Sequence, residues 1–138
     1  MPAKDYIHDA VKNALIKDGW IITHDPYLIR YEEVTLSADL GAEHPLAAER
    51  AGQKIVVEVK SFIGISPIHE LKIALGQYDI YLGFLEIIAP ERKLYIAVSQ
   101  KIYQEFFQLK AIQALMRRYQ TPLIVVNVTT EEIVTWIN

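Results

Sequence analysis

Two charged side chains lie two positions apart in an otherwise apolar run, Ile55-Val56-Val57-Glu58-Val59-Lys60. Because successive side chains of a β-strand point to opposite faces, Glu58 and Lys60 share one face of the predicted strand. Charged groups in a core strand are costly unless they are paired, hydrogen-bonded or bound to a metal ion. Asp39 lies upstream, in a second strand-like segment. Two carboxylates and a lysine on neighbouring strands outline a metal-dependent hydrolytic site.

The expected chemistry assigns a role to each of these groups. Asp39 and Glu58 would bind the metal ion, with the main-chain carbonyl of Val59 as a further ligand. Mg²⁺, or Mn²⁺ in its place, prefers such oxygen ligands and keeps waters that a substrate phosphate displaces. Lys60 would orient the attacking water or stabilise developing negative charge. The alternative for the Glu-Val-Lys motif is an exposed ion pair on an edge strand.

The first predicted helix places a histidine near this site. Residues 5–18 have apolar side chains three and four positions apart, and Gly19 ends the pattern. His8 lies at the edge of the apolar stripe, so we include it as a candidate site residue. The alternative is a boundary histidine that caps the core.

A second predicted helix begins at Pro67, which follows a serine N-cap, and ends before Pro90. One of its faces is an apolar seam. A second face carries Gln77 and Tyr81, one turn apart, which could reach a site beside the sheet. We add Gln77 to the candidate site residues.

The other elements are predicted from short apolar runs between turn residues. Strands are expected at 20–24, 36–40, 55–60, 94–98, 123–128 and 133–137, with a possible strand segment at 46–49 and a turn at 50–53. A helix is expected at about 101–119, with Ile102, Phe106, Leu109, Ile112 and Met116 inward. No regular structure is assigned to residues 27–35. An antiparallel meander of the early strands would let Asp39 face Glu58. The chain is therefore predicted to be one α/β domain over residues 1–138, a mixed sheet flanked by helices.

Composition and motifs exclude several other classes of protein. The 138 residues include no cysteine, which rules out disulfides and thiolate metal sites. No apolar run is long enough to span a membrane, and the first residues lack a signal sequence, so a cytoplasmic location is expected. The net charge of −3 gives no global attraction to nucleic acid. His24, His44 and His69 lack metal-ligand spacing, and neither a Gly-rich phosphate loop nor a nucleophile elbow is found.

The motif Asp39…Glu58-Val59-Lys60 resembles that of the PD-(D/E)XK nuclease superfamily, which has a restriction-endonuclease-like αβββαβ core. More closely, nearly the whole chain resembles the XisH family of cyanobacteria, the fdxN-element excision controlling factors. The stretches that carry this resemblance are His8-Asp9-Ala10-Val11-Lys12-Asn13-Ala14-Leu15, Ala38-Asp39-Leu40-Gly41-Ala42-Glu43, Val57-Glu58-Val59-Lys60-Ser61-Phe62 and Ala74-Leu75-Gly76-Gln77-Tyr78.

The superfamily resemblance implies roles for single residues. Asp39 matches the metal-binding aspartate, Glu58 the second acidic ligand and Lys60 the catalytic lysine. Gln77 falls where many members place a glutamine on the helix that follows the catalytic strand. Related resolvases carry a glutamate in the first helix at a set distance before a glycine, and His8 takes that place before Gly19, a departure from the acidic pattern.

The family resemblance implies a biological process, programmed DNA excision during heterocyst differentiation. DNA, a site-specific recombinase and an XisI-type partner protein are the partners it implies. Two hypotheses follow: a Mg²⁺-dependent endodeoxyribonuclease, or a non-cleaving accessory protein that uses the nuclease fold to bind DNA or a protein partner. A homodimer suits both, because two sites serve two strands.

Overall fold

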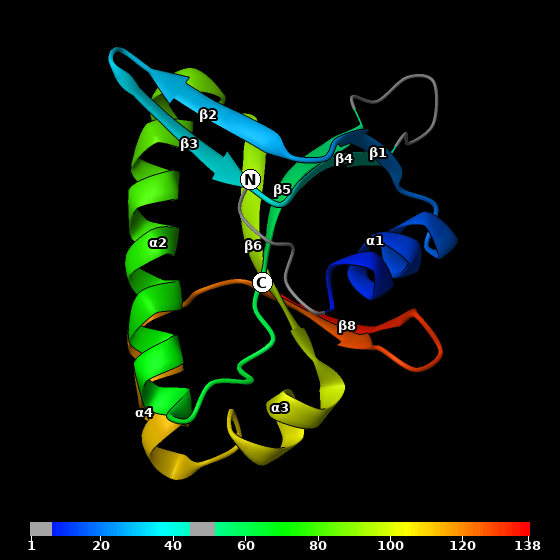
Figure 1. Cartoon of the computed structure of the whole chain (residues 1–138), viewed down its shortest axis with the longest axis vertical. Coiled ribbons are helices and arrows are strands. Elements are labelled where there is room, and N and C mark those ends of the chain that lie inside the picture. Colours follow the sequence, from blue (N-terminus) through cyan, green and yellow to red (C-terminus); the bar gives the residue numbers. More distant parts are fainter. Residues whose placement is uncertain (1–6, 45–51) are drawn as a thin grey trace.

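The computed structural model of the protein describes residues 7–44 and 52–138, and Figure 1 shows the arrangement of the elements. Its helices are α1 (His8–Lys17), α2 (Pro67–Ile88), α3 (Gln100–Glu105) and α4 (Lys110–Tyr119). Its strands are β1 (Ile21–His24), β2 (Tyr27–Tyr31), β3 (Val34–Ala38), β4 (Leu40–His44), β5 (Gln53–Val59), β6 (Arg92–Ser99), β7 (Leu123–Asn127) and β8 (Glu132–Ile137). The chain therefore has the mixed α/β composition that the sequence predicts.

The main sheet has the strand order β1-β4-β5-β6-β7-β8. β4 and β5 pair antiparallel, as predicted for the segments on either side of the turn at 50–53. β1 also pairs antiparallel with β4, although β2 and β3 lie between them in the sequence. β5, β6 and β7 pair parallel, and β8 returns antiparallel. β5 is thus an interior strand. The alternative of an exposed ion pair on an edge strand is therefore wrong for Glu58 and Lys60.

Helices cover both faces of this sheet, with α2 on one side and α1 on the other (Figure 1). Alternate residues of β5 enter different apolar clusters, as the two-residue period of a strand requires. Val56 packs into the cluster under α2, while Val57 and Val59 pack into the cluster under α1. The short run at residues 123–126 is buried on both faces, as its uninterrupted apolar sequence predicts.

The segment at residues 27–38, only partly assigned from the sequence, forms a separate two-stranded sheet of β2 and β3. The strand predicted at 36–40 is in fact two strands, because β3 ends at Ala38 and β4 begins at Leu40. β3 pairs with β2, whereas β4 pairs with β1 and β5. Asp39 alone lies between β3 and β4, so the chain returns from the small sheet to the main sheet at this residue.

The helix predicted at 101–119 is also divided, into α3 and α4. Phe106 and Phe107 lie between the two helices and both are buried. In a continuous helix they would point about 100° apart, so the break lets both rings enter one core. Leu109, predicted to face inward, is 54% exposed and precedes the first turn of α4.

Some predicted segments lie partly or wholly outside the described residues. The strand segment proposed at 46–49 lies outside them, as do residues 50 and 51 of the predicted turn and residues 5 and 6 of the first helix. In the described part of the chain, no helix is both long and apolar enough to cross a membrane.

Candidate active site at the junction of β4 and β5

The carboxylates of Asp39 and Glu58 lie together where the chain passes from β3 to β4, beside the end of β5. We call this place the junction. The main-chain N–H of Asp39 donates to Oε1 of Glu58 at 3.2 Å. In return, the main-chain N–H of Val59 donates to Oδ2 of Asp39 at 2.7 Å. Each carboxylate is therefore held by a main-chain N–H next to the other carboxylate. The pair lies beside Leu40 and Val57, which are opposite each other in the register that sequence alone leaves open.

Lys60 follows directly after β5 and lies on the same side as Glu58, as the strand period predicts. Its main-chain N–H donates to the carbonyl of Ala97 at 2.9 Å, which continues the pairing with β6. Its Nζ lies 3.8 Å from Oε2 of Glu58. The ammonium is thus within ion-pair distance of one carboxylate of the junction.

Glu58 carries its carboxylate in an unfavourable environment. Burial raises its pKa, and the hydrogen bonding and negative charge of Asp39 raise it further, to about 8, against the opposing charge of Lys60. The same surroundings therefore favour the protonated form of this carboxyl over the ionised form. A bound cation would offset the same unfavourable charge.

His8, the candidate from α1, lies on the other side of Asp39 and is 3% exposed. Its Nδ1 is 3.7 Å from Oδ1 of Asp39, and its Nε2 is 3.0 Å from Oδ1 of Asp25. Nδ1 is buried without a hydrogen-bond partner among the described residues. The structure therefore brings His8 to the site, while its part in catalysis stays a prediction.

Asp25 is a member of this cluster that sequence reasoning missed. Oδ2 of Asp25 accepts a hydrogen bond from Lys12 Nζ at 2.7 Å. Although burial raises the pKa of Asp25, the hydrogen bond of Lys12 and the charges of His8 and Lys12 outweigh it and lower the pKa. In the sequence, Asp25-Pro26 shows only as the end of a strand, so no local signal identifies the aspartate.

α2 contributes Tyr81 to the neighbourhood of the carboxylates. Burial raises the pKa of Tyr81 to about 12, with the negative charges of Glu58 and Asp39 adding to the effect. The Tyr81 hydroxyl donates to the main-chain carbonyl of Ser37 at 3.2 Å, which links α2 to β3. Gln77 lies one turn away, and its Oε1 is buried with no hydrogen-bond partner in the described parts of the chain. Its predicted catalytic role stays a prediction.

Tyr81→Phe is expected to lower the free energy of unfolding by about 1 kcal/mol, because it removes one hydrogen bond to a main-chain carbonyl. The matched control is Tyr119→Phe on α4, whose ring is 49% exposed. Urea denaturation of the three proteins measures the effect. Equal midpoints for the wild type and Tyr81→Phe would show that the link between α2 and β3 does not contribute to stability.

The donor set of the junction selects the kind of metal ion that it would hold. Within residues 7–44 and 52–138, no three His, Cys, Asp or Glu side chains are grouped to hold a metal ion. Two carboxylates with a main-chain carbonyl suit Mg²⁺ or Mn²⁺, which take few protein ligands and complete their shell with water. They do not suit a tetrahedral structural Zn²⁺ site, which needs four protein ligands.

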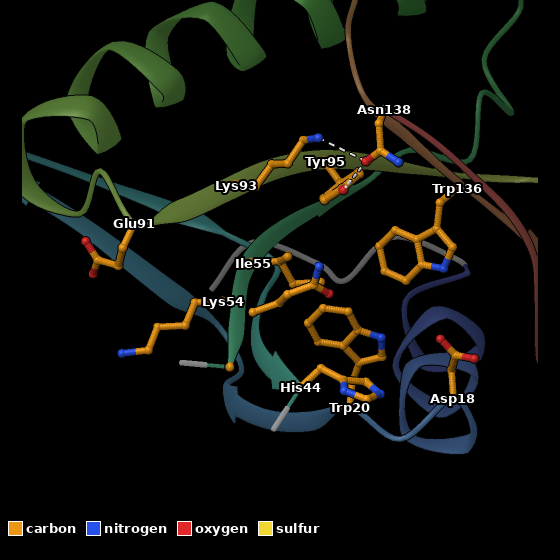
Figure 2. A pocket seen from close by; sticks show the side chains of 12 residues that line it. Asp18, Trp20, His44, Lys54, Ile55, Glu91, Lys93, Tyr95, Trp136 and Asn138 are labelled. Atoms are coloured by element: carbon orange, nitrogen blue, oxygen red, sulfur yellow. Dashed lines mark hydrogen bonds between the residues drawn. The ribbon is translucent and has the colours of Figure 1, made fainter. Parts of the chain in front are cut away.

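A separate pocket of about 520 Å³ lies near the starts of β5 and β6, whereas Asp39 and Glu58 lie by the end of β5 (Figure 2). It is lined in part by Trp20, Tyr95 and Trp136. The ring of Trp136 packs against Trp20, with centroids 5.4 Å apart, and against Tyr95, with centroids 5.1 Å apart. Lys54, near the start of β5, also lines it. Glu58 comes four positions after Lys54, which corresponds to about 13 Å along a strand. The pocket is therefore not part of the carboxylate site.

The fold and the site together define a mixed α/β protein with an acidic pair and a lysine at the carboxyl end of a central strand. The family model described as XisH protein matches residues 1–134. The chain belongs to the XisH family.

Two crystal structures are similar over almost the whole chain. One is an XisH family protein from Nostoc punctiforme PCC 73102, with 42% sequence identity and a TM-score of 0.88, covering 97% of this chain and 100% of that one. The other is an fdxN element excision controlling factor protein from Anabaena variabilis, with 43% identity and a TM-score of 0.87, covering 98% and 100%. No curated protein matches the chain.

Proposed function

We propose that this protein acts on DNA in the programmed excision of the fdxN element, as a Mg²⁺- or Mn²⁺-dependent endonuclease-like protein with its site at Asp39, Glu58 and Lys60. The observation that carries the proposal is the reciprocal pairing of the two carboxylates through backbone N–H groups, with an ammonium within 3.8 Å of Glu58. The name of the Anabaena variabilis relative supports the process. The chain order α1-β1-β4-β5-α2-β6 also supports a restriction-endonuclease-like core.

Each group has a task in this proposal. Asp39, Glu58 and the Val59 carbonyl would hold the divalent ion, which when bound supplies charge stabilisation at the phosphate and a more acidic water. Lys60 would place its positive charge beside the scissile phosphate and stabilise the additional negative charge of the transition state. His8, fixed by Asp25, would orient Asp39. Gln77 would contact the substrate or a water from the α2 side.

Incubation of the purified protein with supercoiled and branched DNA in Mg²⁺ or Mn²⁺ tests the proposal. The wild type is expected to nick or cleave the DNA, and Glu58→Gln and Lys60→Ala to lose at least about 100-fold of that rate. Glu43→Gln is the matched control, because it changes a more exposed carboxylate on the neighbouring strand. Equal cleavage by the wild type and both site variants would identify a contaminating nuclease and contradict the proposal.

A non-cleaving accessory role is the second candidate function. It is favoured by His8, which is held by Asp25 where related nucleases have an acidic residue in the first helix. In this case the fold would bind DNA or proteins of the excision reaction, namely the recombinase and an XisI-type partner. An excision assay in cells separates the two functions. Full excision with Asp39→Asn and Glu58→Gln favours the accessory role, and loss of excision with folded variants contradicts it.

A further inference from the structure

The outer face of α2 carries an exposed stripe with a seven-residue repeat of isoleucine and glycine. The stripe consists of Ile73, Gly76, Ile80, Gly83 and Ile87. The three isoleucines are 42%, 57% and 58% exposed. At 100° per residue, these positions lie opposite the buried positions of the helix, which include Leu71, Tyr78 and Leu85. In Figure 1, α2 forms one side of the molecule, so this stripe faces away from the sheet.

Packing among residues 7–44 and 52–138 gives no reason for the two glycines. A Cβ atom added at Gly76 or at Gly83 would meet no atom of these residues within 4 Å. Glycine in the interior of a helix lowers stability relative to alanine, because it loses more backbone entropy on folding. Two glycines in register with three exposed isoleucines therefore make shallow recesses beside projecting side chains. A helix that is apolar on both of its faces is normally covered on both.

We propose that this stripe is the interface with a second copy of the chain, with the two α2 helices packed antiparallel. In this arrangement Ile80 of one copy lies over Gly76 of the other, and Ile73 lies over Gly83. Ile73 and Ile80 of each copy thus meet a recess, which allows the helices to approach closely at the centre of the stripe. A parallel pair in register would instead place isoleucine against isoleucine and leave the glycines facing each other across a gap.

The charges beside the stripe fit the same antiparallel arrangement. Lys72, Asp79 and Glu86 are exposed and lie on one side of the stripe, seven residues apart. In this register Glu86 of one copy lies two positions, about 3 Å along the helix axis, beyond the point opposite Lys72 of the other. The two long side chains span this offset and give two opposite-charge pairs. Antiparallel packing also brings Asp79 near its own counterpart at the centre, which is unfavourable. A second copy is therefore complementary to the stripe in shape and, at both ends, in charge.

Sedimentation equilibrium of the full chain at concentrations up to about 100 µM measures this association. The wild type is expected to form a dimer, and Ile80→Lys to weaken the dimer at least about tenfold. Ile16→Lys on α1, where the isoleucine is 50% exposed, is the matched control and is expected to dimerise as the wild type does. A monomeric wild type, or dimerisation of Ile80→Lys at wild-type strength, would overturn the proposal.

Charge exchange and glycine replacement test the geometry. Lys72→Glu and Glu86→Lys should each weaken the dimer, and the double variant should restore it, because each copy then supplies both exchanged charges. Asp79→Asn should strengthen it. Gly76→Ala combined with Gly83→Ala should raise the thermal stability of the monomer but weaken the dimer. Failure of the double charge exchange to restore association would overturn the antiparallel pairing.

A different protein on this stripe is the competing outcome. Suppose that the wild type is monomeric and binds an XisI-type partner in a pull-down with purified proteins, and that Ile80→Lys abolishes this binding. The stripe then belongs to that interface, and the proposal is wrong. None of these measurements involves DNA cleavage. The dimer and the proposed nuclease function can therefore fail separately.

Discussion

In the metal-free protein, the free energy of unfolding is expected to fall as the pH rises from about 5 to about 8. The cause is Glu58, whose pKa is raised from 4.5 to about 8, first by burial and then by Asp39. Between these two values the folded protein binds more protons than the unfolded chain, so each pH unit removes up to about 1.4 kcal/mol. The effect is complete once the pH passes the folded-state pKa.

The control for this prediction is Glu58→Gln, which has no group that titrates at this position. Urea denaturation in the presence of EDTA should show a clearly smaller fall for Glu58→Gln, which should exceed the wild type in stability near pH 8. Asp25 does not confuse the measurement, because a lowered carboxyl pKa changes stability only below about pH 5. Parallel pH profiles for the two proteins would show that Glu58 is not held protonated by its surroundings.

Added Mg²⁺ or Mn²⁺ is expected to reverse this fall in the wild type. A cation binds the ionised carboxylates, so its stabilising effect grows with pH as Glu58 loses its proton. Thermal denaturation at pH 6 and pH 8, with and without the ion, measures the difference. Glu58→Gln should gain little at either pH. Equal stabilisation of both proteins by the ion would place the binding site elsewhere in the molecule.

The sequence was sufficient to find Glu58 and Lys60, at the end of β5 and directly after it, because a strand has a fixed period. Glu58 and Lys60 had to share a face whatever the strand paired with, and the structure confirms this. The seam of α2, with Leu71, Tyr78 and Leu85 inward, follows in the same way from the period of a helix. Local periodicity therefore predicts which way a side chain points, but not what lies opposite it.

The parts that were missed depend on contacts between distant residues. Asp39 was placed inside one strand, whereas it joins two sheets, and its hydrogen bond to Val59 spans twenty positions in the sequence. Asp25 meets His8 only because β1 and α1 fold together, seventeen positions apart. No pattern in either segment records these pairings, because hydrogen-bond partners across a fold leave no fixed spacing in the sequence.

Asp39→Ala is expected to lose divalent-ion binding and also to destabilise the protein by about 1–3 kcal/mol, because it leaves the buried N–H of Val59 without an acceptor. Asp39→Asn keeps an acceptor oxygen for Val59 and is expected to lie within about 1 kcal/mol of the wild type. Its amide is a poor ligand for a hard cation, so it should also lose ion binding, by about 100-fold or more. The two variants therefore separate the structural role of Asp39 from its proposed role as a ligand.

The pH of the stability measurement decides whether the two variants report only the loss of the hydrogen bond between Asp39 and Val59. Removing the charge of Asp39 also lowers the pKa of Glu58, so at pH 8 both variants would gain stability from a better-tolerated Glu58. At about pH 5.5 Glu58 is protonated in the wild type, and this contribution is smallest. Calorimetric titration with Mn²⁺ at pH 8 then measures binding, with Glu43→Ala as the surface control. Tight Mn²⁺ binding by Asp39→Asn would mean that Asp39 only joins the two sheets, and the metal-dependent mechanism would lose one of its two carboxylates.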